Sequence, residues 1–371
     1  MQKNWISLGL MSGTSGDGVD ASIIRTNGLN QYDSIKDKYY EYNKDIYKDI
    51  HNLKDKIHKV EDLKTFKSEI DDLERRITIF HAGVIKDLEI KDGTLIGFHG
   101  QTIYHNPEEK ISKQLGNGKL LNQLVKKDVV FDFRSNDIQH GGQGAPLTPI
   151  FHHLIRQQNK IKLPVCFLNI GGISNITIIT NDNYSELISK DIGPGNCLID
   201  TWVRKNSNKK YDLDGLIALR GTRNEIIFEQ AQELYINRNN KKKLSFDTND
   251  FDISFLRGLS FEDGATTLTD FTASIIGEEL SLSLKNVKDK IQTILLCGGG
   301  RKNKVLVEKI KKNLSSNTNL KLIDEFKIDG DFIESQAFAF LAVRSILKLP
   351  ISFPKTTRCT EPCTGGKIIK N

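Results

Sequence analysis

The 371-residue sequence has no apolar run long enough to cross a bilayer. Its first residues, Met1 to Asn4, lead straight into a strand-like stretch without the apolar core of a signal peptide. The five cysteines are odd in number and mostly lie in apolar, strand-like contexts. We therefore expect reduced, buried thiols in a cytoplasmic protein. Cys359 and Cys363 have no second cysteine pair and no histidine at zinc-finger spacing, so we expect no metal site there.

A strong charge of one sign is also absent, because 53 Lys and Arg residues face 47 Asp and Glu residues, a formal net charge of +6. Basic runs such as Lys241 to Lys243 have no aromatic residues among them. We interpret these runs as solvated surface, and we expect no nucleic-acid and no membrane partner. A chain of this length exceeds what one hydrophobic core usually supports, which favours two lobes.

The most informative stretch runs from Gly9 to Asp20, where a glycine-rich turn follows the strand-like residues 5–8. Residues 19–24 form a second strand pattern, so the turn joins strand to strand. A Walker-type loop would need a Lys-Ser/Thr pair and a following helix, and both are missing. Glycines let backbone N–H groups approach an anion, and carboxylates beside a phosphate require a bridging magnesium ion. An ordinary hairpin is the competing interpretation.

The same pattern recurs, which favours a phosphate site over a simple hairpin. Residues 165–170 form an apolar strand, residues 171–175 a glycine turn, and residues 176–180 a second strand. A third glycine cluster, residues 298–300, follows the strand pattern 293–297 and leads into a helical run over 304–314. We interpret this as an internal duplication that places a nucleotide in a cleft between two lobes.

Other polar and glycine-rich segments lie between these units. Apolar residues three and four apart between residues 46 and 77 predict helices laid over a sheet. We expect a strand over residues 93–98 that leads into a turn of small and polar residues, which carries His99 and Gln101. Arg134 and Asp137 precede the glycine-rich segment 141–146, which we expect to approach a ligand with its backbone rather than to act as a linker.

Two carboxylates are candidates for the chemistry. Asp191 directly precedes Gly-Pro-Gly, and we expect it at a strand end, exposed yet held in place, ahead of a helix that starts at Asn196. It fits a general base and fits a turn-capping residue equally well. Glu334 lies near the start of the last long helix, where the helix dipole favours an anion.

Together these motifs resemble those of the anhydro-N-acetylmuramic acid kinases, a family of the actin, sugar kinase and heat-shock-70 ATPase superfamily. The resemblance covers residues 9 to about 366 in the family's order. It rests on the segments Met11-Ser12-Gly13-Thr14-Ser15 through Asp20, His99-Gly100-Gln101-Thr102, Asp132-Phe133-Arg134-x-x-Asp137, Gly141 to Leu147, Asn169 to Asn175, Asp191-x-Gly193-Pro194-Gly195-Asn196 and Cys297 to Gly300.

The resemblance implies an α/β, two-lobed actin-like ATPase fold with a duplicated core and an interlobe nucleotide cleft. We place lobe I at residues 1–163 plus about 350–371, and lobe II at residues 164–349. The family opens the 1,6-anhydro ring of anhydro-N-acetylmuramic acid with water and phosphorylates the freed 6-oxygen from ATP, in cell-wall recycling. The resemblance also allows a homodimer.

The resemblance further implies a role for each matching residue. Asp191 takes the place of the general base, and Glu334 lies near the sugar. The expected ATP contacts are Gly13, Thr14, Ser15, Gly16, Asp17, Gly18, Val19, Asp20, Asn169, Gly171, Gly172, Gly298, Gly299 and Gly300, with Asp17 and Asp20 near Mg²⁺. The expected sugar contacts are His99, Gln101, Arg134, Asp137, Gln143, Gly144 and Pro146.

Gly16, Phe98 and Ile192 depart from the family pattern but keep its chemical groups, and a fourth departure is more serious. Two other functions also compete. Leu244-Ser245-Phe246-Asp247 stands where the family tends to carry Lys-Ser-Thr-Gly-Arg-Glu, so we carry over no sugar contact from that segment. A kinase that phosphorylates an open sugar hydroxyl would use the same parts. A nucleotide-gated binding protein without catalysis would keep the fold, although Asp191 and both glycine hairpins argue against it.

Overall fold

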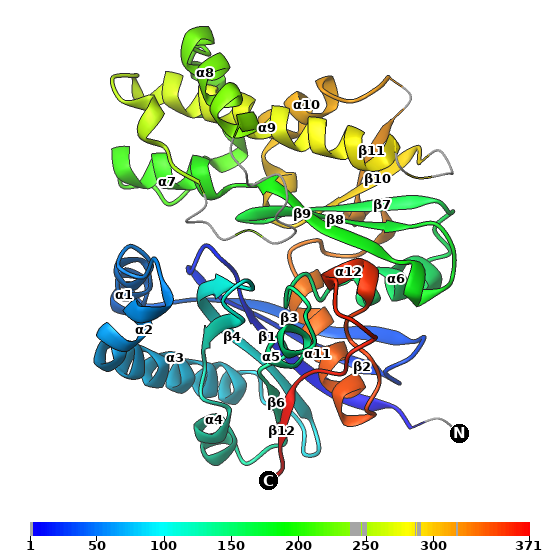
Figure 1. The fold of residues 1–371 in the computed structure, drawn as a ribbon. Coiled ribbons are helices and arrows are strands. Elements are labelled where there is room, and N and C mark those ends of the chain that lie inside the picture. The colour runs from blue at the N-terminus through cyan, green and yellow to red at the C-terminus, as the bar shows by residue number, and fades with distance from the viewer. Residues whose placement is uncertain (1–2, 238–245, 247–250, 286, 288–290, 317) are drawn as a thin grey trace. The chain divides into compact units, whose positions relative to one another are not determined.

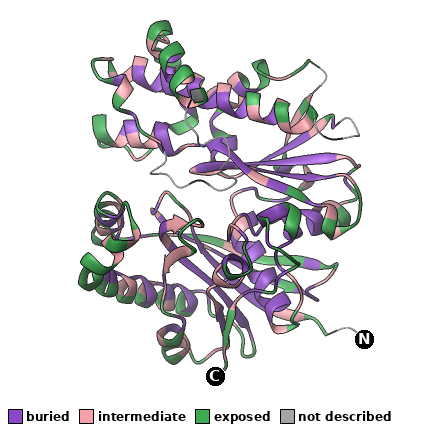
Figure 2. Cartoon of the chain, in the orientation of Figure 1, coloured by how far each residue is buried: buried purple, intermediate pink, exposed green. Residues whose placement is uncertain are grey.

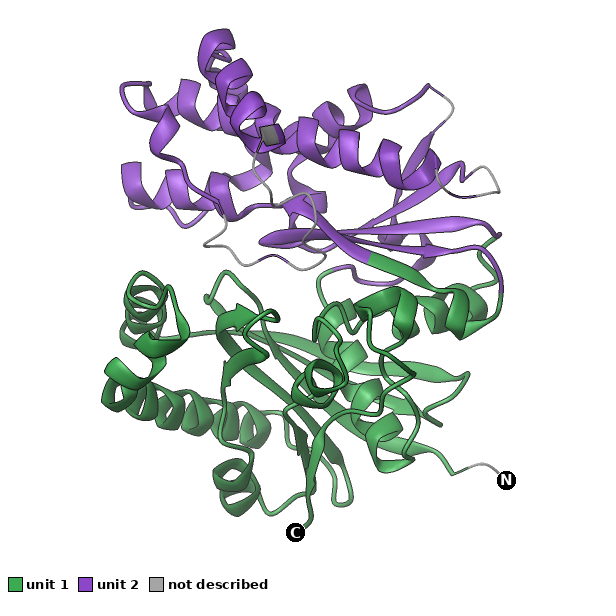
Figure 3. Cartoon of the chain, in the orientation of Figure 1, with its two compact units in different colours: residues 1–162, 182–189, 331–371 green, residues 163–181, 190–330 purple. Residues whose placement is uncertain are grey.

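The computed structural model describes residues 3–237, 246, 251–285, 287, 291–316 and 318–371. They form two compact units (Figure 3). Unit 1 comprises residues 1–162, 182–189 and 331–371, and unit 2 comprises residues 163–181 and 190–330. Each unit is built on one mixed β-sheet with helices packed on it (Figure 1). The strands at the centre of each sheet are buried, whereas the outer faces of the helices are exposed (Figure 2).

The sheet of unit 1 has the strand order β12-β6-β4-β1-β2-β3, with β5 paired to β4. Strand β1 runs antiparallel to β2 and parallel to β4, which is itself parallel to β6. The first two strands confirm the predicted strand pair around the glycine turn, whereas β3 was not predicted. The bounds are β1 Trp5–Ser12, β2 Gly18–Thr26, β3 Tyr32–Glu41, β4 Leu95–Asn106, β5 Ile111–Leu115, β6 Val129–Phe131 and β12 Lys367–Ile369.

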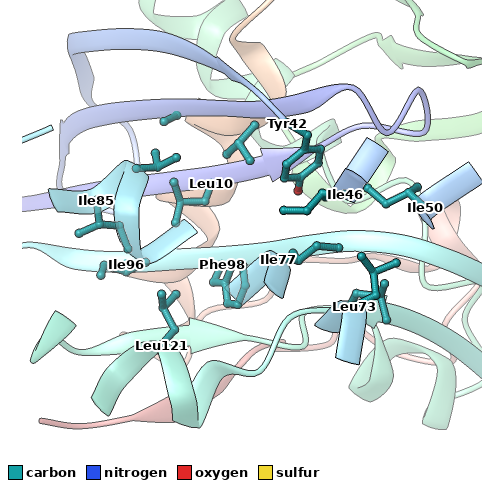
Figure 4. Packing of buried hydrophobic residues seen from close by; sticks show 14 of the residues in the cluster. Leu10, Tyr42, Ile46, Ile50, Leu73, Ile77, Ile85, Ile96, Phe98 and Leu121 are labelled. Carbon is teal, nitrogen blue, oxygen red and sulfur yellow. The ribbon is translucent and has the colours of Figure 1, made fainter. Parts of the chain in front are cut away.

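Helices α1 Lys44–Lys54, α2 Val60–Thr65 and α3 Lys67–Asp87 confirm the helical spacing seen in the sequence. Helix α1 starts at Asn43, whose side chain accepts a hydrogen bond from the N–H of Ile46 at 2.9 Å. The apolar faces of α1 and α3 pack on one face of the sheet together with α4 Gly118–Val125 (Figure 4). This core includes Leu10, Tyr42, Ile46, Ile50, Leu73, Ile77, Ile85, Ile96, Phe98 and Leu121.

Helix α11, Ile333–Ile346, covers the opposite face of the same sheet. Side chains alternate along a strand, so Leu8 and Leu10 of β1 face the first core while Ser7 and Gly9 face α11. Ser7 Oγ donates to Ala339 O at 2.8 Å, and a Cβ at Gly9 would overlap Ser335 O. The sequence-based division placed residues 331–349 in lobe II. Because α11 packs on β1, β2 and β4, these residues instead belong to unit 1.

The sheet of unit 2 has the strand order β11-β10-β7-β8-β9. Strand β7 runs antiparallel to β8 and parallel to β10, which is itself parallel to β11. Unit 1 has the corresponding strand order β6-β4-β1-β2-β3. Its strands β1 and β2 are antiparallel, as β7 and β8 are, and its strands β1 and β4 are parallel, as β7 and β10 are. The predicted duplication is therefore present in the topology. The strand bounds are β7 Val165–Ile170, β8 Ile173–Ile179, β9 Ile188–Pro194, β10 Thr293–Cys297 and β11 Asn319–Leu322.

The remaining helices complete the two units, and the predicted helices after Asn196 and residue 303 are confirmed. Unit 2 has two apolar clusters. In one, α7 and α9 pack together at one end of the sheet, and in the other, α9 and α10 pack on the face of the sheet. The remaining α-helices are α5 Ser135–Gln139, α6 Pro149–Gln158 and α12 Pro354–Thr357 in unit 1, and α7 Cys197–Asn206, α8 Glu225–Asn237, α9 Phe261–Lys285 and α10 Lys304–Lys312 in unit 2.

All five cysteines lie within the described residues, and each is a buried free thiol. This confirms the prediction of reduced, buried cysteines. Within the described part of the chain, none of the helices combines the length and the apolar character needed to span a membrane.

Candidate active site

The turn between β1 and β2 contains glycines with different surroundings. Gly16 has φ +64°, and a Cβ there would lie 2.8 Å from Ile50 Cγ2. A Cβ at Gly18 would overlap Tyr40 O on the neighbouring strand. At Gly13 the nearest atom to an added Cβ is Ser15 Oγ at 3.8 Å. The fold therefore explains Gly16 and Gly18, whereas the space beside Gly13 is available to a ligand.

Three groups hold the backbone of this turn in place. Gln101 Nε2 donates to Gly13 O at 2.9 Å, and Lys54 Nζ donates to Thr14 O at 2.6 Å. The N–H of Tyr42 donates to Asp17 O at 2.9 Å. Sequence reasoning missed Lys54 and Tyr42, because only the fold brings the end of α1 and the end of β3 to the turn.

Gln101 and His99 lie inside β4, not in a turn at its end as predicted. Strand β4 continues to Asn106 because it pairs with a third strand, β5, over residues 101–106. The side chain of Gln101 is fully buried and holds the first glycine turn, while its Oε1 has no hydrogen-bond partner among the described residues. Its contact with a sugar stays a prediction.

A buried polar group lies directly before the turn. The hydroxyls of Ser12 and Tyr42 are 2.7 Å apart, and Ser12 Oγ is 3.5 Å from His81 Nε2. His81 Nδ1 is 2.8 Å from Ile77 O, and a carbonyl can only accept, so Nδ1 carries the proton. Burial lowers the pKa of His81 to about 4. A neutral imidazole therefore supports the strand end that leads into the turn.

Asp17 and Asp20 supply the carboxylates on this turn. Both are partly exposed, and Asp17 Oδ1 accepts from Ser15 Oγ at 2.6 Å. Carboxylate and hydroxyl oxygens are hard ligands that suit Mg²⁺. Thr14 is exposed, whereas Val19 is fully buried in β2 and can meet a ligand only through its backbone.

His99 and Arg134 connect β4 to the glycine-rich loop 141–146. His99 Nδ1 donates to Gly100 O at 2.7 Å, so Nε2 is the acceptor for Arg134 Nη2 at 2.9 Å. Arg134 Nη1 also donates to Gly144 O at 3.0 Å. Burial first, and then the neighbouring guanidinium, lower the pKa of His99 well below its usual value. His99 is thus a neutral, fully buried acceptor that orients Arg134.

Asp137 braces the same loop from the other side. Its Oδ2 accepts from Gly144 N at 2.6 Å, and its Oδ1 accepts from Thr357 Oγ1 at 2.6 Å. The N–H of Gln143 donates to Thr357 O at 2.7 Å. Gln143 remains partly exposed and Pro146 is buried. Asp137 is only 1% exposed, so the structure places it under the loop as a support for its shape.

The second glycine turn, between β7 and β8, is fastened to the segment after Asp191. The N–H groups of Asn196 and Gly195 donate to Gly171 O and Gly172 O at 2.8 and 2.9 Å. A Cβ at Gly195 would overlap Gly171 O. The Gly-Pro-Gly-Asn motif therefore needs this glycine to pack against the second turn.

The third glycine cluster meets the same turn. Gly298 has φ +78°, and a Cβ there would overlap Asn169 Oδ1. A Cβ at Gly300 would overlap Ile170 Cγ2, whereas Gly299 is exposed with no atom within 4 Å of an added Cβ. Unit 2 thus brings together all its predicted nucleotide residues, and Gly299 has the open space that a ligand requires.

Asp191 lies within β9 and is 8% exposed, so the prediction of an exposed residue at a strand end was wrong. Strand β9 continues to Pro194 because it pairs along β8. Asp191 Oδ2 accepts from the N–H of Phe246 at 2.8 Å. The side chain of Phe246 lies 5.5 Å, centroid to centroid, from Phe251. The segment that departs from the family pattern also contains Leu244, Ser245 and Asp247, which lie outside the described residues.

Glu334 occupies the first turn of α11 and is partly exposed. It belongs to unit 1, whereas Asp191 belongs to unit 2. The catalytic roles of both carboxylates stay predictions, as do the individual nucleotide and sugar contacts.

The duplicated sheet, with a glycine turn between the first two strands of each copy, defines an α/β protein of the actin-like ATPase and sugar kinase class. The sequence model of the anhydro-N-acetylmuramic acid kinase family matches residues 5–371. The chain belongs to this family.

Full-length relatives support this membership. The anhydro-N-acetylmuramic acid kinase of Pelagibacter ubique is 54% identical over 374 residues, covering 100% of both chains. The enzyme of the same name from Zymomonas mobilis is 38% identical over 375 residues, covering 98% of this chain and 99% of its own.

Among solved structures, a ROK family glucokinase from Streptomyces griseus in complex with glucose and AMPPNP gives a TM-score of 0.40 at 12% identity, over 91% of this chain and 98% of that one.

Proposed function

We propose that this protein is an ATP-dependent kinase that opens 1,6-anhydro-N-acetylmuramic acid with water and phosphorylates O6. The products are N-acetylmuramic acid 6-phosphate and ADP, and the setting is peptidoglycan recycling in the cytoplasm. The observation that carries the proposal is the match to this kinase family from residue 5 to residue 371. Asp191 and all three glycine clusters lie within that match.

The surroundings of the glycines support the nucleotide part of the proposal. Gly13 and Gly299 have space where a Cβ would stand, so phosphate and nucleoside groups can approach the backbone there. Asp17 and Asp20 would hold Mg²⁺, which neutralises phosphate charge when bound. Lys54, whose Nζ lies 2.6 Å from Thr14 O, adds a positive charge next to this turn.

The chemistry needs one base. Asp191 takes a proton from water as the water oxygen bonds to C1 and the bond from C1 to O6 breaks. The electron pair left on O6 forms a bond to the γ-phosphorus as the bond from that phosphorus to the β,γ-bridging oxygen breaks, and ADP leaves. The departing O6 bonds to the γ-phosphorus and therefore does not need to take up a proton. The carboxylic acid that protonates the leaving oxygen in ordinary glycoside hydrolysis is not required.

The position of Asp191 suits this role. Its carboxylate is oriented by the N–H of Phe246, and β9 places it a few residues before Gly195 and Asn196, which bind the second glycine turn. A base attached to the phosphate turn through one short segment keeps its position relative to the nucleotide, and positioning is the main requirement of phosphoryl transfer.

The direct test is turnover of the anhydro sugar in water enriched in heavy oxygen. We expect ADP formation that depends on the sugar, and one heavy oxygen at C1 of the product. Phosphorylation of ordinary hexosamines without label at C1 would show a conventional sugar kinase instead. ATP binding without turnover of any sugar would show a nucleotide-gated binding protein.

A further inference from the structure

The chain after α11 closes a small loop that brings two cysteines together. The N–H of Ile351 donates to Cys363 O at 2.7 Å, and the N–H of Cys363 donates to Ser352 O at 3.0 Å. Helix α12, Pro354–Thr357, and the turn at Arg358, with φ +63°, return the chain between these ends. Cys359 and Cys363 thereby lie on the inner side of one closed loop and are 2% and 4% exposed.

A third group reaches the two thiols from a distant part of the sequence. Asp137 is 1% exposed, and one of its carboxylate oxygens and the two Sγ atoms lie within 4.8 Å of one another. The hydrogen bond from Thr357 Oγ1 to Asp137 Oδ1, at 2.6 Å, fixes α12 against this carboxylate. The sequence contains no zinc-finger spacing here, because the third group comes from helix α5 and only the fold places it beside the cysteines.

A buried hydroxyl lies next to this cluster. Ser352 is 1% exposed, and its Oγ forms no hydrogen bond with an oxygen or nitrogen atom of any described residue. It lies close to the Cys359 thiol, where it and Thr357 oppose the effect of burial on the pKa of that thiol. Among the described residues, the Cys359 thiol is the only polar partner of this hydroxyl, and a thiol is a weak hydrogen-bonding group, so Ser352 Oγ can act as a further ligand in the cluster.

We propose that Asp137, Cys359 and Cys363 form a binding site for a thiophilic divalent cation of the zinc type. Two sulfurs and one carboxylate oxygen are a borderline-soft set that suits zinc or cobalt rather than magnesium. Ser352 Oγ or a water molecule takes the fourth position of a tetrahedral site. The site is separate from the expected magnesium position on the first glycine turn.

Binding must release protons. Burial raises the pKa of Cys363 to about 12 and raises the pKa of Cys359, so both thiols are protonated without a metal. One divalent cation therefore replaces two thiol protons, and its apparent affinity rises with pH.

A cation bound at this site would affect the hydrogen bonds of the glycine-rich loop 141–146. The carboxylate of Asp137 accepts from Gly144 N at 2.6 Å, and the neighbouring Thr357 O accepts from Gln143 N at 2.7 Å. A cation on Asp137 draws one oxygen away from these donors and shifts the loop. If the proposed function holds, the KM for the sugar changes on metal binding; the binding site itself does not depend on that function.

The experiment uses the full chain, reduced with a phosphine and freed of metal by a chelator. We expect titration with Co²⁺ to produce a thiolate-to-metal absorption band that saturates at one equivalent and disappears when Zn²⁺ is added. Cys359→Ser and Cys363→Ser should each weaken Co²⁺ binding by at least about tenfold. Cys166→Ser, a buried thiol in β7 of unit 2, is the matched control and should bind Co²⁺ as the original chain does.

A second measurement needs no variant. Zn²⁺ should slow the alkylation of Cys359 and Cys363 in the original chain, read by peptide mass, while leaving the rate at Cys166 unchanged. Absence of the absorption band, equal binding by all three variants, or no protection from alkylation would each overturn the proposal. Formation of a Cys359–Cys363 disulfide in air, with no metal bound under reducing conditions, would also overturn it.

Discussion

At the scale of single residues, the glycines of the first glycine turn separate into two kinds. Gly16 and Gly18 are required by the protein itself, through a positive φ and through contact with Ile50 and Tyr40. Gly13 has open space around it and no such requirement. The sequence shows the glycines but not this difference, because only the packed structure tells which ones already touch protein atoms.

Gly13→Ala should therefore weaken nucleotide binding without lowering the stability of the fold. The added Cβ would stand where we propose that phosphate approaches, so we expect ATP affinity to fall by about tenfold or more. The free energy of unfolding should stay equal or rise by up to about 1 kcal/mol, because alanine restricts the unfolded chain. Calorimetric ATP titration and urea unfolding measure the two effects.

Gly18→Ala is the control, and it should lose about 1–3 kcal/mol of stability because its Cβ overlaps Tyr40 O. Normal ATP affinity in a folded Gly13→Ala protein would contradict the phosphate assignment of this turn.

Asp191→Asn should separate binding from rate. The amide keeps the shape of the side chain and can still accept from Phe246 N, but it no longer accepts a proton from water. We expect near-normal affinities for ATP and sugar, with turnover lower by about two to four orders of magnitude. Titration calorimetry and a coupled ADP assay make the comparison. Affinity that falls in step with rate would show a positioning role, and normal turnover would move the search for the base to Glu334.

Buried histidines should make stability depend on pH. Burial lowers the pKa of His81 from 6.5 to about 4, so the unfolded chain takes up this proton before the folded chain does. The free energy of unfolding therefore falls as pH drops from about 6.5 toward 4, by up to about 1.4 kcal/mol per pH unit for this group. His105 and His152, each with a pKa lowered to about 3, act in the same direction.

Urea unfolding at a series of pH values measures this slope. His81→Gln should show a shallower slope than the original chain, while His58→Gln, at an exposed position, should leave the slope as it was. Equal slopes in the original chain and in His81→Gln would show that His81 is not responsible.

At the scale of elements, α11 depends on two strands that carry glycine where the helix crosses them. A Cβ at Gly97 of β4 would overlap Phe338 O, as one at Gly9 of β1 would overlap Ser335 O. We expect Gly97→Ala to lower the free energy of unfolding by about 1–3 kcal/mol or more, because the helix must move away from the sheet. Urea unfolding and near-ultraviolet circular dichroism report this change.

Gly83→Ala provides the matched control for Gly97→Ala. Gly83 is exposed on α3 with no atom within 4 Å of an added Cβ, so alanine should stabilise the helix by about 0.5–1 kcal/mol. A Gly97→Ala protein as stable as the original chain would mean that α11 does not pack on β4 as closely as the structure shows.

At the scale of the whole molecule, the duplicated sheet order is the strongest link between sequence and structure. The sequence predicts nucleotide contacts on both copies, at Gly13 in unit 1 and at Gly299 in unit 2. We predict that joint binding of nucleotide and sugar brings the units closer together. Solution scattering should then give a smaller radius of gyration with both ligands than with either one. An unchanged radius would contradict this prediction.

The sequence by itself determined the repeated strand and glycine-turn units, the main helices and the family. Those features depend on local patterns: apolar spacing over residues 46–77, glycines after strands, and motif order. The tertiary structure decided what each residue meets. It extended β4 through Gln101 by pairing with β5, buried Asp191 by continuing β9 along β8, and moved α11 to unit 1.

The same limit explains the cluster around Asp137. Apolar or cysteine-containing patterns predict that a side chain is buried, but burial does not say which distant segment covers it. Asp137 and Thr357 are 220 positions apart in the chain, and their hydrogen bond exists only because the C-terminal segment folds back over the glycine-rich loop. Long-range packing of this kind has no local signal, so the neighbours of Cys359 and Cys363 could be identified only from the folded chain.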